Sequence, residues 1–245
     1  MPLFHRPAWP LAAATLALLA WLPAGHAALS LNSTRVVFDS DKRNVSLVVN
    51  NPSRSTFAVQ TWVNTDADDT TTAVPLIASP PLFRLDPGTE QLVQINALPA
   101  TLPEDRESLF FFNVQEIPEA RDGASNVLNI ALRTRIKLFY RPVQLGNDPM
   151  SRLGELHWSI ERHDGQPRLV VHNPTPFHFS FSRLELLDGE RTIRPEDAPM
   201  VAPLSRQTYP LASQRLGTRL QVTFAAINDY GGYSKPLTVA VRPGS

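Results

Sequence analysis

The sequence contains no cysteine, and its charges cancel, with 23 lysines and arginines against 23 aspartates and glutamates in 245 residues. The absence of cysteine excludes thiol catalysis, cysteine-ligated zinc or iron–sulfur sites and a disulfide framework. A net charge of zero argues against a general nucleic-acid-binding protein, which needs a strongly positive surface.

Motifs of enzymes and of metal sites are missing too. There is no G-x-S-x-G, no H-E-x-x-H and no phosphate-binding glycine loop. The histidines beyond residue 27 lack a metal-ligand spacing, which predicts ordinary surface or turn residues at His157, His163, His172 and His178. An exported hydrolase would need a catalytic motif or a metal-ligand spacing of this kind. We therefore expect that this protein is not an enzyme and that it binds no cofactor and no metal.

A helical apolar period does not persist over any long segment, and the 23 prolines are about twice the usual share. So much proline disfavours long helices and suits strands and turns. Short β-rich runs bounded by turn residues predict an all-β chain with room for two immunoglobulin-like β-sandwich domains. These runs span residues 45–49, 57–63, 91–95, 109–114, 169–171, 177–181 and 220–225.

Residues 1–27 have the layout of a secretory signal peptide. Arg6 gives a basic start, Leu11 to Leu22 form an apolar run, and Pro23 precedes small residues that end at Ala27. The competing interpretation is a membrane anchor, for which the run is too short. We expect cleavage after Ala27, export, and no membrane insertion of the mature chain.

The best break between domains lies at residues 141–149, where the apolar pattern stops and proline, glycine, asparagine and aspartate gather. We predict an N-terminal domain over residues 28–146 and a C-terminal domain over residues 147–245.

One long strand is predicted from Asn126 to Tyr140, fifteen residues without glycine or proline. Leu128, Ile130 and Leu132 share one face of it. The segment is either an ordinary half-buried strand or a strand whose apolar row faces a partner, and periodicity does not decide between them. A long alternating strand is a pairing template only if it lies at a sheet edge.

Several motifs, in order, carry a family resemblance. The chain resembles the periplasmic pilus-assembly chaperones of the Gram-negative chaperone/usher pathway. This family is built of two immunoglobulin-like sandwiches set in an L with an interdomain cleft. The motifs are TRVVF at 34–38, SPPLFRL at 79–85, LPEDRESLFFFNVQEIP at 102–118, TRIKLFYRP at 134–142, NPTP at 173–176 and INDYGG at 227–232.

The resemblance implies a function: an ATP-independent chaperone that binds, folds and caps pilus or fimbrial subunits and delivers them to an outer-membrane usher in the periplasm. Two basic residues, Arg35 and Lys137, would hold the subunit's C-terminal carboxylate through charge-assisted hydrogen bonds. Without the resemblance, each would be read as a solvated surface charge. The alternative is a structural pilus subunit or adhesin, which usually has a cysteine pair that this chain lacks.

The resemblance also implies donor-strand complementation, in which the chaperone lends a strand to an incomplete subunit. That strand maps onto residues 126–132, with Asn126 at its start and Leu128, Ile130 and Leu132 as the inserted side chains. Lys137 has the opposite parity, so we expect a bulge, a strong twist or a bend between Leu132 and Lys137. Whether the free protein hides the strand by self-association stays open.

A buried charge network across the domain junction is implied for Glu107, Arg141 and Asp229, where Arg141 would otherwise be a linker surface charge. Buried charges must be paired, so this triad would fix the domain angle. The seven-residue connection at 119–125 fits the branch of the family with a short F1–G1 loop. Pro80 and Pro81 match a site that often has a cis bond, whose isomer the sequence does not show.

Overall fold

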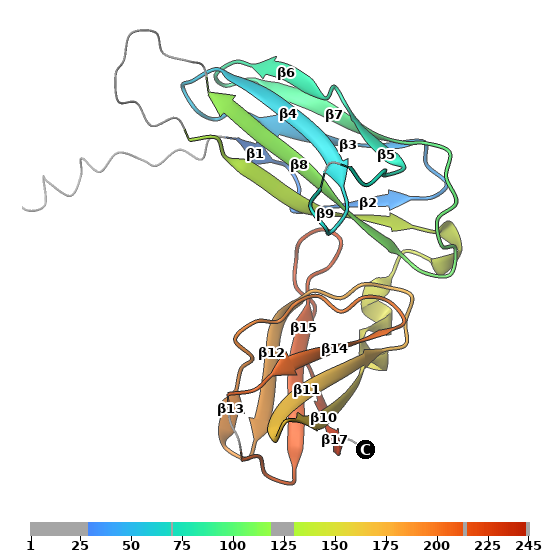
Figure 1. The fold of residues 1–245 in the computed structure, drawn as a ribbon, viewed down its shortest axis with the longest axis vertical. Helices are drawn as coiled ribbons and strands as arrows, with labels where there is room; N and C mark the ends of the chain where they lie inside the picture. Colours follow the sequence, from blue (N-terminus) through green and yellow to red (C-terminus); the bar gives the residue numbers. More distant parts are fainter. Residues whose placement is uncertain (1–28, 70, 119–129, 213–214, 244–245) are drawn as a thin grey trace, which may run out of the picture.

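The computed structural model describes residues 29–69, 71–118, 130–212 and 215–243 and confirms the predicted all-β fold with two immunoglobulin-like domains. The strands of the two lobes run in different directions, and the lobes meet at one end in an L-shaped arrangement (Figure 1). Among the described residues, the helical segments are short 3₁₀ turns, η1 (Val143–Leu145) and η2 (Pro149–Glu155), within and just beyond the predicted break.

The N-terminal domain is a sandwich of two sheets. Strands β1-β3-β7-β5 form one sheet, and β2-β9-β8-β4-β6 form the other. The second sheet contains a parallel pair, β2 with β9, next to the antiparallel pair β8 with β9. The strands are β1 (Ser30–Leu31), β2 (Arg35–Asp39), β3 (Asn44–Asn50), β4 (Phe57–Asn64), β5 (Leu76–Ser79), β6 (Leu82–Leu85), β7 (Glu90–Ala97), β8 (Ser108–Pro118) and β9 (Arg133–Arg141).

The C-terminal domain is a second sandwich, with sheets β14-β11-β10-β17 and β13-β12-β15-β16. Its strands are β10 (His157–His163), β11 (Gln166–Asn173), β12 (Phe181–Asp188), β13 (Arg191–Ile193), β14 (Ser205–Pro210), β15 (Leu220–Ala226), β16 (Leu237–Ala240) and β17 (Arg242–Pro243). The Ser79–Pro80 bond in the N-terminal domain is cis.

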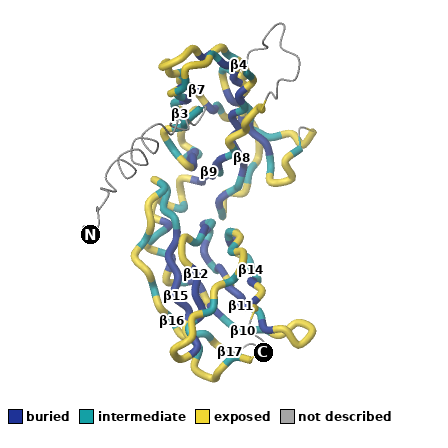
Figure 2. Tube along the Cα trace, turned by 90° about the vertical axis from the view of Figure 1, so that its left-hand side faces the viewer, coloured by how far each residue is buried: buried dark blue, intermediate teal, exposed yellow. Residues whose placement is uncertain are grey.

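Each domain has its own hydrophobic core, formed by the alternating side chains of its strands (Figure 2). In β4, Phe57, Val59 and Val63 are buried. Each such side chain contributes about 1.5–3 kcal/mol on full burial. In the C-terminal domain, Trp158 packs against the ring of Phe224 at 5.0 Å between centroids. Two separate cores explain why the domains need further contacts to hold a fixed angle.

Two strands have bounds in the structure that differ from the predicted ones. Residues 177–180 form no strand, apart from a single bridge between Phe179 and Val201, and β12 begins at Phe181. Pro174 and Pro176 lie just before this stretch and donate no backbone hydrogen bonds to a ladder. The long strand predicted from Asn126 begins at Arg133, and residues 126–129 lie outside the described part of the chain.

A buried asparagine closes the corresponding turn in both domains. Asn173 Nδ2 donates to the carbonyls of Phe177 and Ala202, at 2.8 and 2.7 Å. Its Oδ1 accepts from the backbone N–H and hydroxyl of Thr175. Asn51 makes the same four contacts with Ser53, Ser55 and Leu85. The two N-P-S/T motifs are therefore structural equivalents, and the C-terminal one shapes the turn that faces the N-terminal domain.

We expect Asn173→Ala to lower the free energy of unfolding of the C-terminal domain by about 2–5 kcal/mol, because two buried carbonyls would lose their donors. Urea denaturation followed by tryptophan fluorescence measures the effect. Asn44→Ala, an exposed asparagine in β3, is the control and should change the midpoint little. Equal midpoints for Asn173→Ala and Asn44→Ala would show that the buried amide does not stabilise the turn.

Candidate functional site

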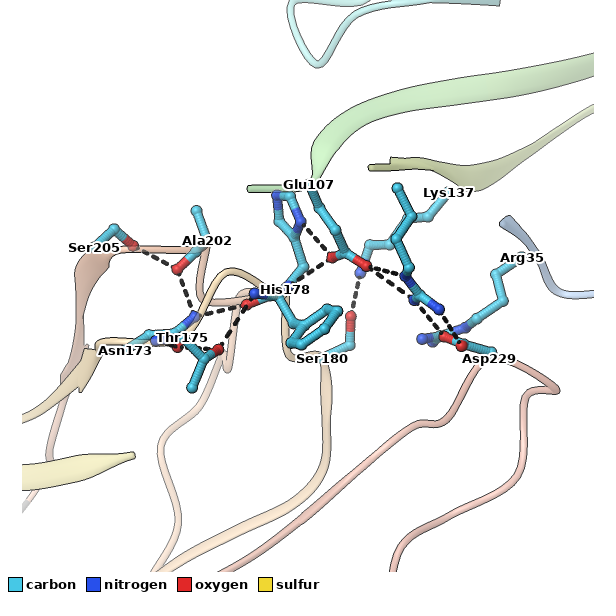
Figure 3. A network of polar contacts seen from close by, with 12 residues as sticks. Arg35, Glu107, Lys137, Asn173, Thr175, His178, Ser180, Ala202, Ser205 and Asp229 are labelled. Atoms are coloured by element: carbon cyan, nitrogen blue, oxygen red, sulfur yellow. Dashed lines mark hydrogen bonds and ion pairs between the residues drawn. The ribbon is translucent and has the colours of Figure 1, made fainter. Parts of the chain in front are cut away.

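The three residues predicted as a charge network lie in contact at the junction of the two domains (Figure 3). Arg141 is the last residue of β9, Glu107 directly precedes β8, and Asp229 lies between β15 and β16. Arg141 Nε donates to Glu107 Oε1 at 2.9 Å. Its two terminal nitrogens donate to the two oxygens of Asp229, at 2.7 and 3.0 Å. One guanidinium thus joins a carboxylate of each domain.

Glu107 also binds the C-terminal domain directly. Its Oε2 accepts from the backbone N–H of His178 at 2.8 Å and lies 3.0 Å from His178 Nδ1. The backbone N–H of Glu107 donates to the carbonyl of Pro176 at 3.0 Å. The prediction that His178 is an ordinary surface or turn histidine is wrong, because its side chain is buried against Glu107 and packs on Phe139.

Two members of the network are almost fully removed from water, and the third, Asp229, is partly buried. Arg141 is 2% exposed and Glu107 is 4% exposed. Burial by itself would lower the pKa of Arg141, but the hydrogen bonds to Asp229 and the charge of Glu107 outweigh it and raise that pKa. Arg141 therefore stays charged, and the loss of any partner would leave an uncompensated buried charge.

Arg35 and Lys137 lie side by side, because they are partners in the parallel pairing of β2 with β9. Both side chains reach the C-terminal domain. Arg35 Nη1 donates to the carbonyl of Ile227 at 3.0 Å. Lys137 Nζ donates to the hydroxyl of Ser180 at 2.8 Å (Figure 3). The structure thus brings the two predicted anchor residues together beside the network.

These two cations are poorly compensated. Burial, followed by the neighbouring charge of Arg35, lowers the pKa of Lys137, and burial lowers the pKa of Arg35. Neither forms an ion pair with a carboxylate of the described residues, and Arg35 Nε is buried without a hydrogen-bond partner. Arg35 itself is 9% exposed. An anionic group placed here would relieve both the repulsion and the unmet hydrogen-bonding capacity.

The edge of β9 is open next to this cation pair. Strand β2 pairs with β9 only from Lys137 onward, whereas β8 pairs with β9 from Arg133. Among the described residues, the side of residues 133–136 that faces away from β8 therefore has no strand partner. Just before them, Ile130 is 59% exposed and Leu132 is 53% exposed. Asn126 and Leu128, the other predicted donor residues, lie outside the described part of the chain.

No bulge separates Leu132 from Lys137 along the described strand. The pairing of β8 with β9 runs in one register from Gln115–Arg133 to Ser108–Tyr140, and Glu116 N donates to Leu132 O at 3.0 Å in the same register. Of the three distortions that we expected between Leu132 and Lys137, the bulge is therefore ruled out. Even-numbered residues such as Ile136 and Leu138 face the core, and Lys137 projects from the opposite face.

The described residues contain no group of three or more histidines and carboxylates that could hold a metal ion. No helix in the described part of the chain is long and apolar enough to cross a membrane. The junction contains hydrogen bonds between the domains, the cations Arg35 and Lys137 without an ion pair to a described carboxylate, and an open strand edge.

Fold and junction together define a two-domain immunoglobulin-like protein whose domains are joined by buried charges. Profiles of two protein domains match the chain. The N-terminal domain of PapD-type pili and flagellar-assembly chaperones matches residues 28–146, and the C-terminal domain of the PapD pili-assembly chaperone matches residues 152–237. The chain belongs to this family of pilus-assembly chaperones, which fold and assemble other proteins and are not enzymes.

Individual relatives support the same family assignment. The chain is 35% identical to the probable fimbrial chaperone YadV of Escherichia coli K12, covering 87% of this chain and 90% of YadV. It is 36% identical to the chaperone FimB/FhaD of Bordetella pertussis, covering 91% of each chain. These relatives are named as chaperones, which favours the chaperone role over the alternative of a structural pilus subunit.

Solved structures show the same architecture. The crystal structure of the YadV chaperone matches with a TM-score of 0.76 at 33% identity, covering 88% of this chain and all of that chain. The SafB chaperone of Salmonella enterica, solved in complex with the SafA pilin, is 26% identical. It matches with a TM-score of 0.74, covering 89% of this chain and 98% of that chain.

Sequence reasoning missed the residues that complete the site from the C-terminal domain. Ser180 binds Lys137, the Ile227 carbonyl binds Arg35, and His178 binds Glu107. The only signal was the position of these residues inside or just after the NPTP and INDYGG motifs. A carbonyl acceptor cannot be read from a side-chain pattern.

We expect Arg141→Met to lower the free energy of unfolding by about 3–5 kcal/mol, because Glu107 and Asp229 would lose their cation at a buried junction. Thermal melting followed by circular dichroism measures the loss. Arg141→Met combined with Glu107→Gln should recover part of it, because one of the stranded charges is then gone.

The matched control is Arg152→Met. Arg152 pairs with Glu155 at a half-exposed position, so its loss should change stability by less than about 1 kcal/mol. An unchanged melting curve for Arg141→Met would contradict a structural role of the network.

Proposed function

We propose that this chaperone binds pilus subunits by adding a strand at the open edge of β9 and by holding the subunit's C-terminal carboxylate between Arg35 and Lys137. The subunit would take up Leu128, Ile130 and Leu132 as inserted side chains, with Asn126 at the start of the donated segment. Backbone hydrogen bonds along residues 130–136 would give affinity with little regard to the subunit's sequence.

The observation that carries this proposal is the charge count at the junction. Three cations, Arg35, Lys137 and Arg141, meet there with two carboxylates, Glu107 and Asp229. Both carboxylates are bound by Arg141, so Arg35 has only their longer-range attraction, and Lys137 has only that of Asp66. A further carboxylate would give both cations the direct partner that they lack among the described residues, and every protein chain ends in one.

The geometry also gives the direction of the added strand. The carboxylate site lies at Lys137, where β2 starts to cover β9, and the open edge extends from there back to residue 130. A client strand that ends at Lys137 and pairs with this edge must run in the same direction as β9. The proposal therefore includes parallel pairing, with the client strand continuing the line of β2.

The remaining steps rest on family membership and sequence. We propose export to the periplasm by a leader at residues 1–27, release of the subunit to an outer-membrane usher, and domains at residues 28–146 and 147–245. The profile matches at residues 28–146 and 152–237 support this division. The short F1–G1 loop stays a prediction, because residues 119–129 lie outside the described part of the chain.

We expect Lys137→Met to weaken binding of a co-expressed pilus subunit by about tenfold to a hundredfold, the usual effect of losing a hydrogen bond to a charged group. The melting temperature of the free chaperone should not fall, because the lost charge is desolvated and lies beside Arg35. Co-purification from the periplasm and thermal melting measure the two effects. Lys42→Met, at an exposed lysine, is the control for both.

The lowered pKa of Lys137 gives this prediction a pH dependence. Lys137 is charged below that pKa and neutral above it, so affinity should begin to fall at a pH below the usual lysine value of 10.5. Lys137→Met should lack this alkaline loss. Full complex yield with Lys137→Met at neutral pH would contradict the proposed anchor.

We expect Ile130→Ser with Leu132→Ser to abolish capture of the subunit and to leave the free protein's stability unchanged. Both side chains are exposed in the free protein, and their burial in a client would contribute about 3–6 kcal/mol gross. Part of this is offset by the cost of association. Leu82→Ser, at an equally exposed leucine in β6, is the control. Equal complex yields for the double variant and the control would rule out insertion of these side chains.

A further inference from the structure

The outer face of β9, which points away from the N-terminal core, presents a cation at every second position before Phe139. Arg133, Arg135 and Lys137 alternate with the core-facing Ile136 and Leu138. A client strand that slipped by two residues would keep all its side chains on the same faces and would move by about 6.7 Å. Its carboxylate would then lie near Arg135 instead of Lys137.

Asp68 is the carboxylate that the two arginines facing a slipped client share, although it forms no hydrogen bond with Arg135 Nε, which is buried without a hydrogen-bond partner. It follows β4, and its side chain binds both terminal nitrogens of Arg133, with Oδ2 3.1 Å from Nη1 and Oδ1 bonded to Nη2. Asp68 Oδ1 also lies 3.7 Å from Arg135 Nε. Arg135 Nη2 donates to the carbonyl of Thr65 at 2.7 Å in the same loop.

Further contacts hold Asp68 in this place. Asn64 Nδ2 donates to Asp68 Oδ1 at 2.8 Å, and Asn113 Oδ1 accepts from Arg133 Nε at 3.0 Å. The hydrogen bonds from Arg133 and Asn64 lower the pKa of Asp68 to about 2, so this carboxylate is charged at neutral pH. The backbone of Asp68 has φ of 57°, a conformation that aspartate and asparagine tolerate better than most residues.

The guanidinium groups are also fixed by the sheet beneath them. Arg133 lies over the ring of Trp62 at 4.9 Å, and Arg135 lies over the ring of Phe111 at 3.7 Å. Both arginines lie within 4 Å of Asp68, in contrast with Arg35 and Lys137, which have no carboxylate partner among the described residues.

We propose that Asp68 sets the register of the bound client because it already occupies the positive face formed by Arg133 and Arg135, so that the client's carboxylate is preferred at Arg35 and Lys137, which have no such partner. This role rests on the proposed strand addition and makes Asp68 a specificity-determining residue. Backbone pairing alone does not distinguish two registers that differ by two residues, so the difference in affinity comes from the charges.

Disulfide mapping tests the register directly, because the chain has no cysteine of its own. Thr134→Cys places one thiol at an exposed position on β9. The probes are synthetic peptides of alternating apolar and polar residues with a free carboxyl terminus, each with one cysteine at a different position. The parent Thr134→Cys protein should cross-link to one peptide position.

Adding Asp68→Asn should produce a second cross-link two positions closer to the peptide's carboxyl end. If the second register gives about a tenth of the cross-linked product, it is less favourable than the first by about 1.4 kcal/mol. Adding Arg135→Met to Asp68→Asn should restore the single register, which a merely structural role of Asp68 would not do. Asp86→Asn is the control, because Asp86 binds Arg84 and Thr56 away from β9.

Three results would overturn the inference, and they separate the role of Asp68 from strand addition. A single unchanged register with Asp68→Asn would refute the role of Asp68 and leave strand addition intact. The same holds if the second register survives Arg135→Met. If the parent cross-links to none of the peptides, strand addition at β9 is refuted, and the role of Asp68 is refuted with it.

Discussion

The guanidinium of Arg141 joins the two domains through a carboxylate of each. It lies at the end of β9, where it binds Glu107 of its own domain and Asp229 of the other. The two hydrophobic cores are separate, and we propose that the buried polar contacts of this junction set how the domains face each other. Since Ser180 and Ile227 belong to the C-terminal domain, the positions of Lys137 and Arg35 follow from the same constraint.

The cations along the outer face of β9 differ in whether they are paired with a carboxylate. At one end Arg141 has two carboxylates, and at the other end Arg133 and Arg135 share Asp68. Between them, Lys137 and Arg35 are desolvated and held close without an ion pair to a described carboxylate. Keeping two like charges together in a folded protein costs stability. A bound carboxylate would recover that cost, which is why we interpret the gap as a site and not as a defect of folding.

The sequence predicted what depends on local pattern. Alternation of apolar residues predicted the strands and the all-β fold, and the ordered motifs predicted that Glu107, Arg141 and Asp229 belong together, as their contacts show. Residues that act through the backbone or across a loop were missed. His178 and Ser180 reach the junction only because Asn173 closes the preceding turn, and Asp68 reaches Arg133 across 65 residues. Such contacts leave no periodic signal.

The alternation of side chains along β9 decides which face of the strand Lys137 occupies. A straight strand places Ile136 toward the core and Lys137 on the opposite face, and the structure keeps this alternation without a bulge. The apolar row and the anchor therefore use different faces of one strand, while its open edge supplies backbone hydrogen bonds. In the proposed complex, a client is recognised by features that all subunits share, a backbone and a carboxyl terminus. Because the backbone repeats every two residues, we propose that the cations without a carboxylate partner, together with the start of β2, define where the client strand ends.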